Sequence, residues 1–410
     1  VFSPRCGLRA WWKIALTAQG AVFVVLAAAN ATWLGGLSLT AFPANLLAIP
    51  WVSITVVPAV LAGVFVVAVS ETLAGLAWSA AAFSMGLLNQ ALGWLEILQP
   101  SLWVVRAPSP WVAAGATGGA LALLLPRGLP GRWLGLFLLV PLLLPAKNGI
   151  EPEGMQIDAL DAGQGSAILV ATRGHVMLYD TGAGDGAGRD SVATVIEPAL
   201  TGLGRAAPDR VIISHGDLDH SGGLYSMRSH FPGVPVLGSL REPQAGVRNC
   251  RQGQHWSADG FDYRVLHPSA GLPYLRNDSS CVISVEGENV RVLLPGDVDQ
   301  GVERRLLLDT LEPHDVLFAP HHGSASSSGW GFLRRVSPSF AIATAGLGNR
   351  FGFPRDDVRA RYAALGLDLW ATGECGGIRL TFAADGRVNT TSARNQSRRI
   401  WRWPAAPNCP

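Results

Sequence analysis

The stretch I-I-S-H-G-D-L-D-H-S-G-G, residues 212–223, decides how the soluble part of this chain folds and what it binds. An apolar run ends at Ser214, and the six residues after it include four potential metal ligands, His215, Asp217, Asp219 and His220. On a tight loop these side chains would repel one another or stay unpaired unless a cation joined them. A plain polar loop is the alternative, but imidazole and carboxylate together suit zinc or manganese. The sequence therefore predicts a metal site at the end of a strand.

Short β-rich runs alternate with helix-like segments around this loop. The runs are Gln156–Leu160, Ala167–Ala171, His175–Tyr179, Val211–Ser214, Val282–Val285, Val290–Leu294, Val316–Ala319 and Phe340–Thr344. Helix-like segments include Arg189–Leu203 and Gln300–Leu311. Strands that alternate with helices predict a layered α/β domain.

Further chemical groups stand at the ends of these runs. L-Y-D-T-G places Asp180, L-L-P-G-D places Asp297, and A-P-H-H-G-S places His321 and His322. In this order the set resembles the metallo-β-lactamase superfamily and its H-x-H-x-D-H signature, with Asp217 where the second His usually stands. The resemblance implies an αββα domain in which Asp180 braces the ligand loop, Asp297 bridges two metals and one late His is a ligand.

Two divalent ions, zinc or manganese, are therefore the expected cofactors. The first ion is expected to take His215, Asp217 and Asp297, with Asp278 as a possible extra ligand. The ligands expected for the second ion are Asp219, His220, Asp297 and one of His321 or His322. Since adjacent strand residues point to opposite faces, only one of that pair should bind directly, and the other should donate a proton or orient the first. The candidate catalytic residues are Asp219 and His322.

Charged residues are sparse in the first part of the chain. Between Ile14 and Ile150 they are Glu71, Glu96, Arg106, Arg127, Arg132 and Lys147. Five apolar stretches fill this region, at residues 14–39, 42–69, 73–98, 112–125 and 133–144. The first three are long enough to cross a hydrocarbon core of about 30 Å, and the last two are short tilted spans or re-entrant pieces. We therefore expect a multi-span α-helical membrane bundle over residues 1–148, an α/β domain over 149–390 and a loose C-terminal tail over 391–410.

Three prolines, Pro43, Pro50 and Pro58, interrupt the second apolar stretch. They suggest a broken or re-entrant element that lines a polar path, and an ordinary kinked helix is the alternative.

Basic residues predict the orientation of the bundle. Arg5, Arg9 and Lys13 precede the first stretch, Arg127 and Arg132 lie between the fourth and fifth, and Arg106 is a single exception. If all five stretches cross, both clusters lie on one side, which the positive-inside rule assigns to the cytoplasm. The α/β domain is then expected outside the cytoplasm.

The five cysteines contain no C-x-x-C pair, which argues against a thiolate zinc site. One disulfide in an extracytoplasmic domain, between Cys250 and Cys375, is a possible pairing.

A closer resemblance covers essentially the whole chain. The segments that carry it are D-A-G-Q-G-S at 161–166, R-N-D-S-S-C-V at 276–282, H-H-G-S-A-S-S-S at 321–328, G-L-G-N-R-F-G at 346–352 and the membrane stretch 43–58. They resemble the DNA-internalisation competence proteins of the ComEC family, of which this chain looks like the C-terminal half. The resemblance implies an inner-membrane channel for one strand of transforming DNA, with the appended domain proposed to degrade the other strand. Single-stranded DNA, membrane lipid, other uptake machinery and a second copy of the chain are the partners that it implies.

Three positions depart from the family pattern. Ala162 replaces a Val, which is a minor change, and Ser166 stands where relatives often carry Asp, so no catalytic duty falls to it. Phe353 stands where the N-R-F-G-H-P pattern has His. If that His assists catalysis or holds substrate, this chain has lost it.

Three functions remain open from the sequence. The first is a metal-dependent phosphodiesterase acting on DNA during uptake, and the second is a DNA-binding domain with weakened catalysis. The third is a membrane-anchored hydrolase of a lactam, thioester or lipid phosphodiester, because a fold alone does not fix a substrate. A basic and aromatic patch would favour single-stranded DNA, and an ordinary solvated helix is the alternative. The candidates are Arg334, Arg335, Arg350, Arg355, Arg359 and Arg361 with Phe351, Phe353 and Tyr362.

Overall fold

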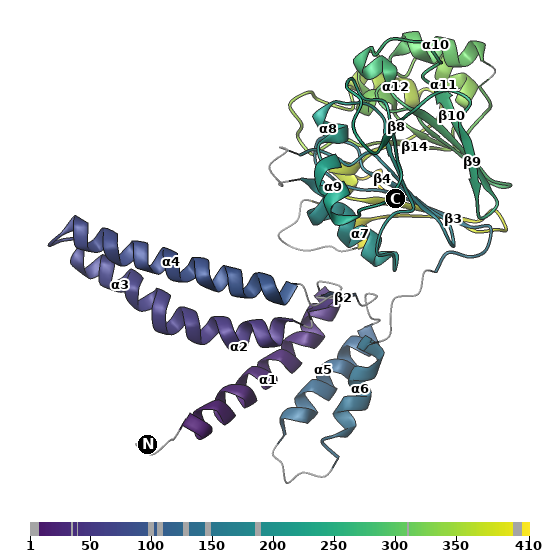
Figure 1. The fold of residues 1–410 in the computed structure, drawn as a ribbon. Coiled ribbons are helices and arrows are strands. Elements are labelled where there is room, and N and C mark those ends of the chain that lie inside the picture. Colours follow the sequence, from purple (N-terminus) through teal and green to yellow (C-terminus); the bar gives the residue numbers. More distant parts are fainter. Residues whose placement is uncertain are drawn as a thin grey trace. The chain divides into compact units, whose positions relative to one another are not determined.

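The structure is a computed structural model that describes residues 8–33, 36–38, 40–96, 102–104, 110–125, 131–143, 149–184, 190–309, 311–396 and 404–410. The chain divides into two compact units, Val1–Lys147 and Asn148–Pro410, and Figure 1 shows both. Of the basic residues used to predict the orientation, Arg5, Arg106 and Arg127 lie outside the described residues.

The first unit is helical. Its helices are α1 (Leu8–Trp33), α2 (Ala41–Trp51), a π-helical segment (Val52–Val56), α3 (Val57–Val66), α4 (Glu71–Glu96), α5 (Pro110–Leu124) and α6 (Leu134–Leu143). Two short strands, β1 (Gly36–Ser38) and β2 (Leu102–Val104), pair antiparallel. Helices therefore form in each of the five apolar stretches.

The proline-containing stretch forms one continuous helical run, so the expectation of a broken or re-entrant element is wrong. Helix α2 passes through the π-helical segment into α3, and the residues that join them, Val52 and Val57, have right-handed helical backbones. Pro50 lies inside α2, and a proline at the first turn of α3 needs no intrahelical N–H. A π-helical turn shifts the hydrogen-bond register, which lets the helix pass these prolines.

Membrane-spanning character differs among these helices. Within the described ranges, Ala41–Val66 is the one helix long and apolar enough to cross a membrane, judged by length and composition. Shorter apolar helical segments in the described part of this unit are Leu16–Ala27, within α1, and Trp111–Leu124, within α5. Large apolar side chains such as Phe65, Phe83 and Trp111 are nevertheless mostly exposed in this unit, as expected for a surface that faces lipid.

Small residues bring the helices of the first unit together. A Cβ on Gly119 of α5 would lie 2.6 Å from the Gly135 carbonyl oxygen of α6, and the reverse contact would be 2.3 Å. Only glycine allows backbones to approach so closely, a packing common between membrane helices.

The second unit contains two β-sheets. The eight-stranded sheet has the order β17-β16-β3-β4-β5-β6-β7-β8 and the seven-stranded sheet the order β15-β14-β13-β12-β11-β10-β9. The strands of the first are β3 (Met155–Ala159), β4 (Ile168–Ala171), β5 (Val176–Tyr179), β6 (Arg210–Ile213), β7 (Val236–Gly238), β8 (Val247–Asn249), β16 (Ile378–Phe382) and β17 (Val388–Ser392). Those of the second are β9 (His255–Ala258), β10 (Phe261–His267), β11 (Val282–Glu286), β12 (Arg291–Leu294), β13 (Val316–Phe318), β14 (Phe340–Ala343) and β15 (Leu369–Ala371). A strand overlaps each of the predicted β-rich runs.

Helices cover the outer face of each sheet, which gives the four layers of an αββα domain (Figure 1). The helical elements of this unit are a π-helical turn (Val192–Ile196), α7 (Glu197–Gly202), α8 (Leu218–Ser221), α9 (Leu224–His230), α10 (Gln300–Leu308), α11 (Trp330–Val336), α12 (Asp356–Ala363), α13 (Thr372–Cys375) and α14 (Ala393–Gln396), with 3₁₀ turns at Arg276–Ser279 and Pro320–Gly323. One apolar core, with Ile157 and Ile283 among its members, joins the two sheets. A second core lies between the first sheet and α7 and α9, and a third lies between the second sheet and α10, α11 and α12.

The disulfides differ from the pairing considered from the sequence. Cys250 is bonded to Cys281, and Cys375 is bonded to Cys409, so the Cys250–Cys375 pairing is wrong. The sequence could not distinguish these pairings, because disulfide geometry depends on which loops meet in space.

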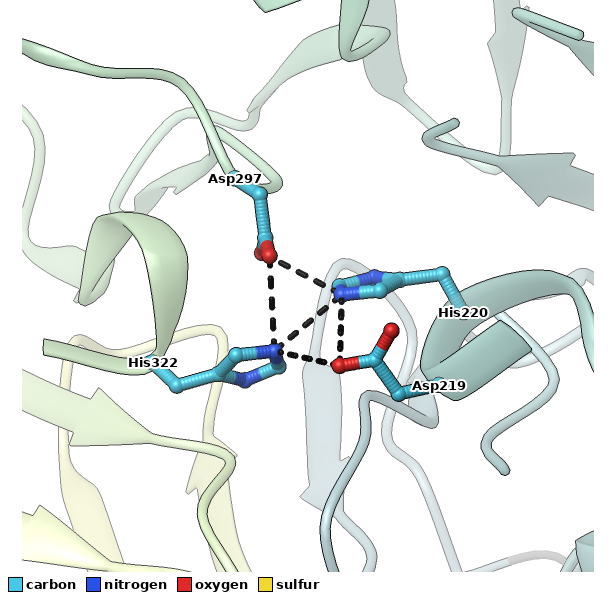
Figure 2. A group of neighbouring side chains, drawn as sticks. All are labelled: Asp219, His220, Asp297 and His322. Atoms are coloured by element: carbon cyan, nitrogen blue, oxygen red, sulfur yellow. Dashed lines mark hydrogen bonds and ion pairs between the residues drawn. The ribbon is translucent and has the colours of Figure 1, made fainter. Parts of the chain in front are cut away.

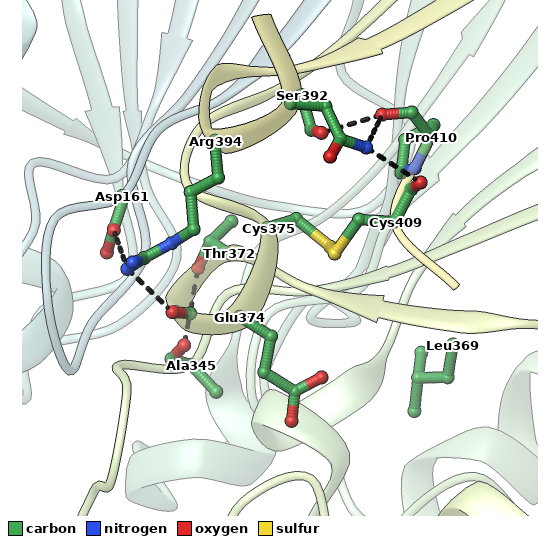
Figure 3. The surroundings of a disulfide bond; sticks show 12 residues. Asp161, Ala345, Leu369, Thr372, Glu374, Cys375, Ser392, Arg394, Cys409 and Pro410 are labelled. Carbon is green, nitrogen blue, oxygen red and sulfur yellow. Dashed lines mark hydrogen bonds and ion pairs between the residues drawn. A yellow bond between two sulfur atoms is a disulfide. The ribbon is translucent and has the colours of Figure 1, made fainter. Parts of the chain in front are cut away.

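The C-terminal residues are attached to the domain, in contrast to the expected loose tail. Cys409 is held by its disulfide to α13, and the Pro410 carbonyl oxygen accepts a hydrogen bond from the Ser392 hydroxyl at 2.6 Å (Figure 3). Nearby, Arg394 donates to the Gly373 carbonyl oxygen at 2.9 Å and lies 3.7 Å from the Asp161 carboxylate. The basic segment 397–403 lies outside the described residues.

Candidate metal centre

The predicted ligands gather where parallel strands of the two sheets end. Strands β5 and β6 are parallel neighbours in the first sheet and precede Asp180 and the loop that begins at Ser214. In the second sheet Asp297 follows β12, and the His pair follows β13, which lies parallel to β12. The carboxyl ends of parallel strands meet at one edge of a sheet. Ligands that are far apart in the sequence, from Asp180 to His322, therefore come together there.

Four residues form the centre of this group: Asp219, His220, Asp297 and His322 (Figure 2). One ligand atom from each lies within 4.8 Å of all the others. His220 Nε2 lies 3.1 Å from His322 Nε2 and 3.2 Å from Asp297 Oδ1. His322 Nε2 lies 3.4 Å from Asp219 Oδ2 and 3.5 Å from Asp297 Oδ2. These are the residues expected for the second ion, with His322 as the member of the pair that joins them.

A buried carboxylate orients His220. Asp180 is fully buried and adopts a left-handed backbone, with φ 61°, directly after β5. Its Oδ2 lies 2.7 Å from His220 Nδ1, and it accepts hydrogen bonds from the Ser214 N–H and hydroxyl at 2.7 and 2.9 Å. Because a carboxylate only accepts, His220 donates from Nδ1, and its Nε2 atom points into the cluster.

The other ring nitrogen of His322 lies beside a hydroxyl group that sequence reasoning missed. His322 Nδ1 lies 3.2 Å from Thr344 Oγ1, and Thr344 directly follows β14. The register of β13 with β14 could have indicated this neighbour, because Phe318 is opposite Ile342, two residues before Thr344.

The His pair lies on a left-handed turn, whereas the sequence reasoning placed it on a strand. His321 and His322 have φ values of 51° and 54°, inside the 3₁₀ turn Pro320–Gly323. Gly323 continues with φ 80°, and a Cβ there would lie 2.7 Å from the Pro354 Cβ. The turn therefore needs glycine at this position, and it separates the two imidazoles as the strand argument required, for a different reason.

His215 and Asp217 lie beside the cluster. His215 Nε2 is 3.8 Å from Asp217 Oδ2, and the rings of His215 and His220 are 4.3 Å apart. Asp217 also lies 3.5 Å from an Arg276 guanidinium nitrogen, in a partly exposed position. These are two of the three ligands expected for the first ion.

Two predicted ligands are not among the four residues of the cluster. His321 Nε2 lies 3.3 Å from the Asn277 amide nitrogen and 3.7 Å from Asp297 Oδ2, and the side chain is one-quarter exposed. The Asp278 carboxylate accepts a hydrogen bond from the Asp299 N–H at 3.2 Å, just before α10. Asp278 therefore helps to start a helix in this structure, and the four-residue cluster forms without it.

The electrostatics of the centre favour cation binding. Burial would raise the pKa of Asp219, but the hydrogen bond to His322 and the charge of His220 lower it to about 2. Burial and the neighbouring charge of His220 lower the pKa of His215 to about 3, so its imidazole is neutral. Burial acts against ionisation of Asp297, but His220 and His322 hold its pKa well below the usual value. The ionised carboxylates and the neutral His215 are in the protonation states that a metal requires. Burial would lower the pKa of His220, but the Asp297 and Asp180 carboxylates raise it well above its usual value, so binding of a metal would release a proton from this imidazole.

The donor atoms fit divalent metal ions. The one hydrogen of the Ser214 hydroxyl goes to Asp180, so His215 Nδ1, 3.1 Å from that oxygen, must donate to it. The lone pair of His215 is then on Nε2, which is buried and has no hydrogen-bond partner among the described residues. A buried, unpartnered imidazole nitrogen is costly unless a cation takes its lone pair.

The D-A-G-Q-G-S segment supports the ligand loop from outside the cluster. Ser166 donates its backbone N–H to the Asp219 carbonyl oxygen at 3.0 Å. Gly165 has φ 145°, and a Cβ there would lie 2.4 Å from the same carbonyl oxygen. This segment therefore sets the backbone of Asp219, a role that requires no side chain at Gly165.

Phe353 packs on the His pair. Its ring centroid lies 5.7 Å from that of His321 and 6.2 Å from that of His322, with planes 24° apart in the second pair. The position of the missing family histidine is therefore directly beside the centre, and an apolar ring fills it.

Two family models match the chain. Residues 160–330 match the Metallo-beta-lactamase superfamily, and residues 3–130 match Competence protein. The fold implies binding of divalent metal, and the cluster lies within the first match.

Curated relatives match most of the chain. Competence protein ComA of Neisseria gonorrhoeae is 32% identical over 344 residues, which cover 83% of this chain and 48% of that protein. Recombination protein 2 of Haemophilus influenzae is 30% identical over 390 residues, which cover 88% of this chain and 49% of that protein. ComE operon protein 3 of Bacillus subtilis is 26% identical, with 78% of this chain and 46% of that protein covered. The chain spans about half the length of the curated relatives that it matches.

Solved structures are also similar to part of the chain. The metallo-beta-lactamase fold protein YhfI from Bacillus subtilis matches with 12% identity and a TM-score of 0.36, covering 53% of this chain and 95% of that one. With both matched regions in one chain and these relatives along most of it, the chain belongs to the competence-protein family in which a competence region precedes a metallo-β-lactamase domain.

Proposed function

We propose that this chain forms part of a bacterial inner-membrane channel for uptake of transforming DNA, and that its second unit is a metal-dependent phosphodiesterase acting on the strand that is not transported. The observation that carries the proposal is the cluster of Asp219, His220, Asp297 and His322, in a chain that also carries a competence region. Single-stranded DNA, membrane lipid and other uptake machinery are the proposed partners, with a second copy of the chain as a further one.

In this proposal the clustered side chains would hold two divalent ions. His215, Asp217 and Asp297 would hold one ion, and Asp219, His220, Asp297 and His322 would hold the other. The chemistry that such ions supply is a hydroxide near neutral pH and compensation for charge on the phosphodiester.

The side chains around the ions orient the reaction. Asp180 fixes the His220 tautomer, so the Nε2 lone pair stays directed at the cluster. His321 is partly exposed, lies beside the Asn277 amide and the Ser326 hydroxyl, and can hold the proton that the leaving oxygen takes. Asp219 and His322 remain the proposed catalytic residues, because they would hold the ion beside which the phosphodiester reacts.

The proposed location is multi-pass in the inner membrane, with the second unit outside the cytoplasm. Two disulfides, Cys250–Cys281 and Cys375–Cys409, support this side, because disulfides persist in oxidising compartments and are rare in the cytosol. The exposed apolar side chains of the first unit support its insertion in lipid.

A cleavage assay tests the proposed activity. The full 410-residue chain in detergent is incubated with end-labelled single-stranded DNA and Mn²⁺ or Zn²⁺, beside Asp219→Ala and Phe353→His. We expect metal-dependent cleavage by the parent and none by Asp219→Ala. Absence of cleavage by both the parent and Phe353→His would rule out the nuclease.

A second function is favoured by the contact of Phe353 with both histidines. Position 353 carries an apolar ring where the family pattern has an imidazole, so it cannot take part in proton transfer, as expected for a DNA-binding domain with weakened catalysis. Cleavage that appears only in Phe353→His would establish this alternative, whereas equal cleavage by parent and variant would exclude it.

A further inference from the structure

A row of stacked groups leads outward from the metal centre. The Phe353 ring lies over His322, the Phe351 ring stacks on Phe353 at 5.4 Å with planes 17° apart, and the Arg350 guanidinium lies 4.7 Å from the centre of the Phe351 ring. Phe351 is 43% exposed, unlike most aromatic rings of this unit. The row thus joins a cluster residue to an open aromatic surface.

The loop that carries this row is held firmly. The Asn349 side chain accepts from the Phe353 N–H at 2.9 Å and donates to the carbonyl oxygens of Phe353 and Gly346 at 2.7 and 2.9 Å. The Arg355 N–H donates to the Gly323 carbonyl oxygen at 3.0 Å, which ties the loop to the turn of the His pair. A surface fixed in this way loses little conformational freedom when a ligand binds.

Arg350 is a free cation at the end of the row. It is exposed, and no carboxylate pairs with it among the described residues. Two other basic candidates from the sequence are paired with carboxylates, since Arg359 bonds Glu374 and Arg361 bonds Asp357. Tyr362, also a sequence candidate, is fully buried, so it does not belong to this exposed row.

We propose that Phe351, backed by Phe353, is a stacking platform beside the metal centre for an unpaired nucleobase. The Arg350 guanidinium, which lies over the Phe351 ring in this structure, would turn aside to the phosphate that adjoins the base. The inference rests on the proposed function and names its substrate more closely. A stacked aromatic surface binds the π face of any base, and a guanidinium binds the adjoining phosphate. In a duplex the base faces are covered by neighbouring pairs, so the platform selects a single strand.

Equilibrium binding separates the base from the phosphate. The full chain in detergent, with chelator present to prevent turnover, is titrated with an oligothymidylate of about 12 nucleotides and with an abasic strand of equal length and charge. The parent should bind the strand with bases more tightly, by about 5- to 100-fold per stacked base. Phe351→Leu should remove this preference and leave affinity for the abasic strand unchanged.

The arginine has a different signature. Arg350→Ala should weaken both strands by a similar factor and reduce the salt slope by about 0.7, the value for one lost phosphate contact on a single strand. A matched control lies at the opposite end of β6, where the Arg210 guanidinium is 4.3 Å from the Trp256 ring and Trp256 stacks on Tyr263 at 5.1 Å. Arg210→Ala and Trp256→Leu should change the affinity for neither strand.

Equal affinity of the parent for both strands would overturn the platform, as would a Phe351→Leu variant that weakens both strands alike. Cleavage is measured separately, so the two proposals fail separately. A base preference without metal-dependent cleavage would support the platform proposal and contradict the nuclease proposal. Cleavage without a base preference does the reverse.

Discussion

The metal centre is built from two halves that orient their histidines by different chemistry. The first sheet supplies His220, whose Nδ1 lies 2.7 Å from the buried carboxylate of Asp180. The second sheet supplies His322, whose Nδ1 lies 3.2 Å from the hydroxyl of Thr344. Both histidines are buried, and both direct Nε2 at the same cluster.

The two partners, Asp180 and Thr344, should affect metal affinity and ring orientation differently. A carboxylate partner fixes the tautomer and makes the ring a more basic ligand, whereas a hydroxyl can donate or accept and mainly sets orientation. The first half is therefore expected to contribute most of the metal affinity. The second half carries the partly exposed His321 and the aromatic row, so it is expected to handle substrate.

The largest effect is expected at Asp297, the residue of the second half whose carboxylate lies beside both His220 and His322. Asp297→Asn should reduce cleavage by at least about 100-fold, because a neutral amide cannot hold two cations together. Cleavage rate and metal content are measured on the same preparation. Asp278→Asn is the matched control, because its carboxylate faces the Asp299 N–H, and it should cleave within about 3-fold of the parent. A large loss in Asp278→Asn would make it a ligand after all.

A smaller effect tests the two partners of the histidines directly. Asp180→Asn should weaken metal binding by about 10- to 100-fold, and asparagine tolerates the left-handed backbone at this position. Thr344→Val should weaken it by less than about 10-fold, since only a neutral hydrogen bond is lost. Metal titration with a competing chelator gives both values. Equal losses would show that the halves do not differ in this way.

The disulfides offer a third test, because one of them joins the halves. Cys250 follows β8 of the first sheet and Cys281 precedes β11 of the second, next to Ser280, whose hydroxyl accepts from the Asp297 N–H at 3.0 Å. Replacing either cysteine pair by alanine should cost about 2–4 kcal/mol, measured by thermal unfolding. Only the Cys250/Cys281 variant should also lose metal affinity. The Cys375/Cys409 variant is its control, and an equal loss there would mean that general stability sets the affinity.

The smallest expected effect is a pH dependence confined to the second half. Glu303 of α10 is buried and accepts hydrogen bonds from the Ser328 and Gly329 N–H groups at 2.5 and 2.8 Å, which fixes the segment after the His pair. Burial raises the pKa of Glu303 from 4.5 to about 7, against the opposing effect of these N–H groups. The folded state thus binds an extra proton, and its contribution to stability is full below about pH 4.5 and is lost as the pH rises through about 7.

The measurement is the apparent Tm of the second unit between pH 5 and pH 8. In the parent we expect the free energy of unfolding, derived from these Tm values, to fall by about 2 kcal/mol over this range. Glu303→Gln should be less stable at every pH and should show a flatter profile. Parallel profiles for the two proteins would assign the decline to other groups.

The ligand loop and the fold were predictable because their signals are local. His215 to His220 stand together in the sequence, and short β-rich runs mark nearly every strand that positions them. Asp180 and Asp297 stand at the ends of predicted strands, and the family resemblance assigned their roles. The division of the chain near residue 148 was also visible, since charged residues become frequent there.

The rest depended on distant contacts. Which histidine of the pair joins the cluster follows from a left-handed turn held against Pro354, which no local pattern encodes. The role of Asp278 depends on a helix that begins three residues after Asp297, and the disulfide pairs depend on which loops of the two sheets meet. Exposure of Phe351 and burial of Tyr362 likewise come from packing, because both are aromatic residues in a basic segment.

The bond between Cys250 and Cys281 also has a consequence for when the proposed nuclease becomes dangerous to its own cell. A domain still in a reducing compartment lacks the covalent link between the sheets that carry Asp180 and Asp297. In the proposed orientation the bond forms only after the domain has left the cytoplasm, so the chromosome is separated from the finished site by time as well as by the membrane. Formation of this disulfide would then be the maturation step that makes the enzyme active.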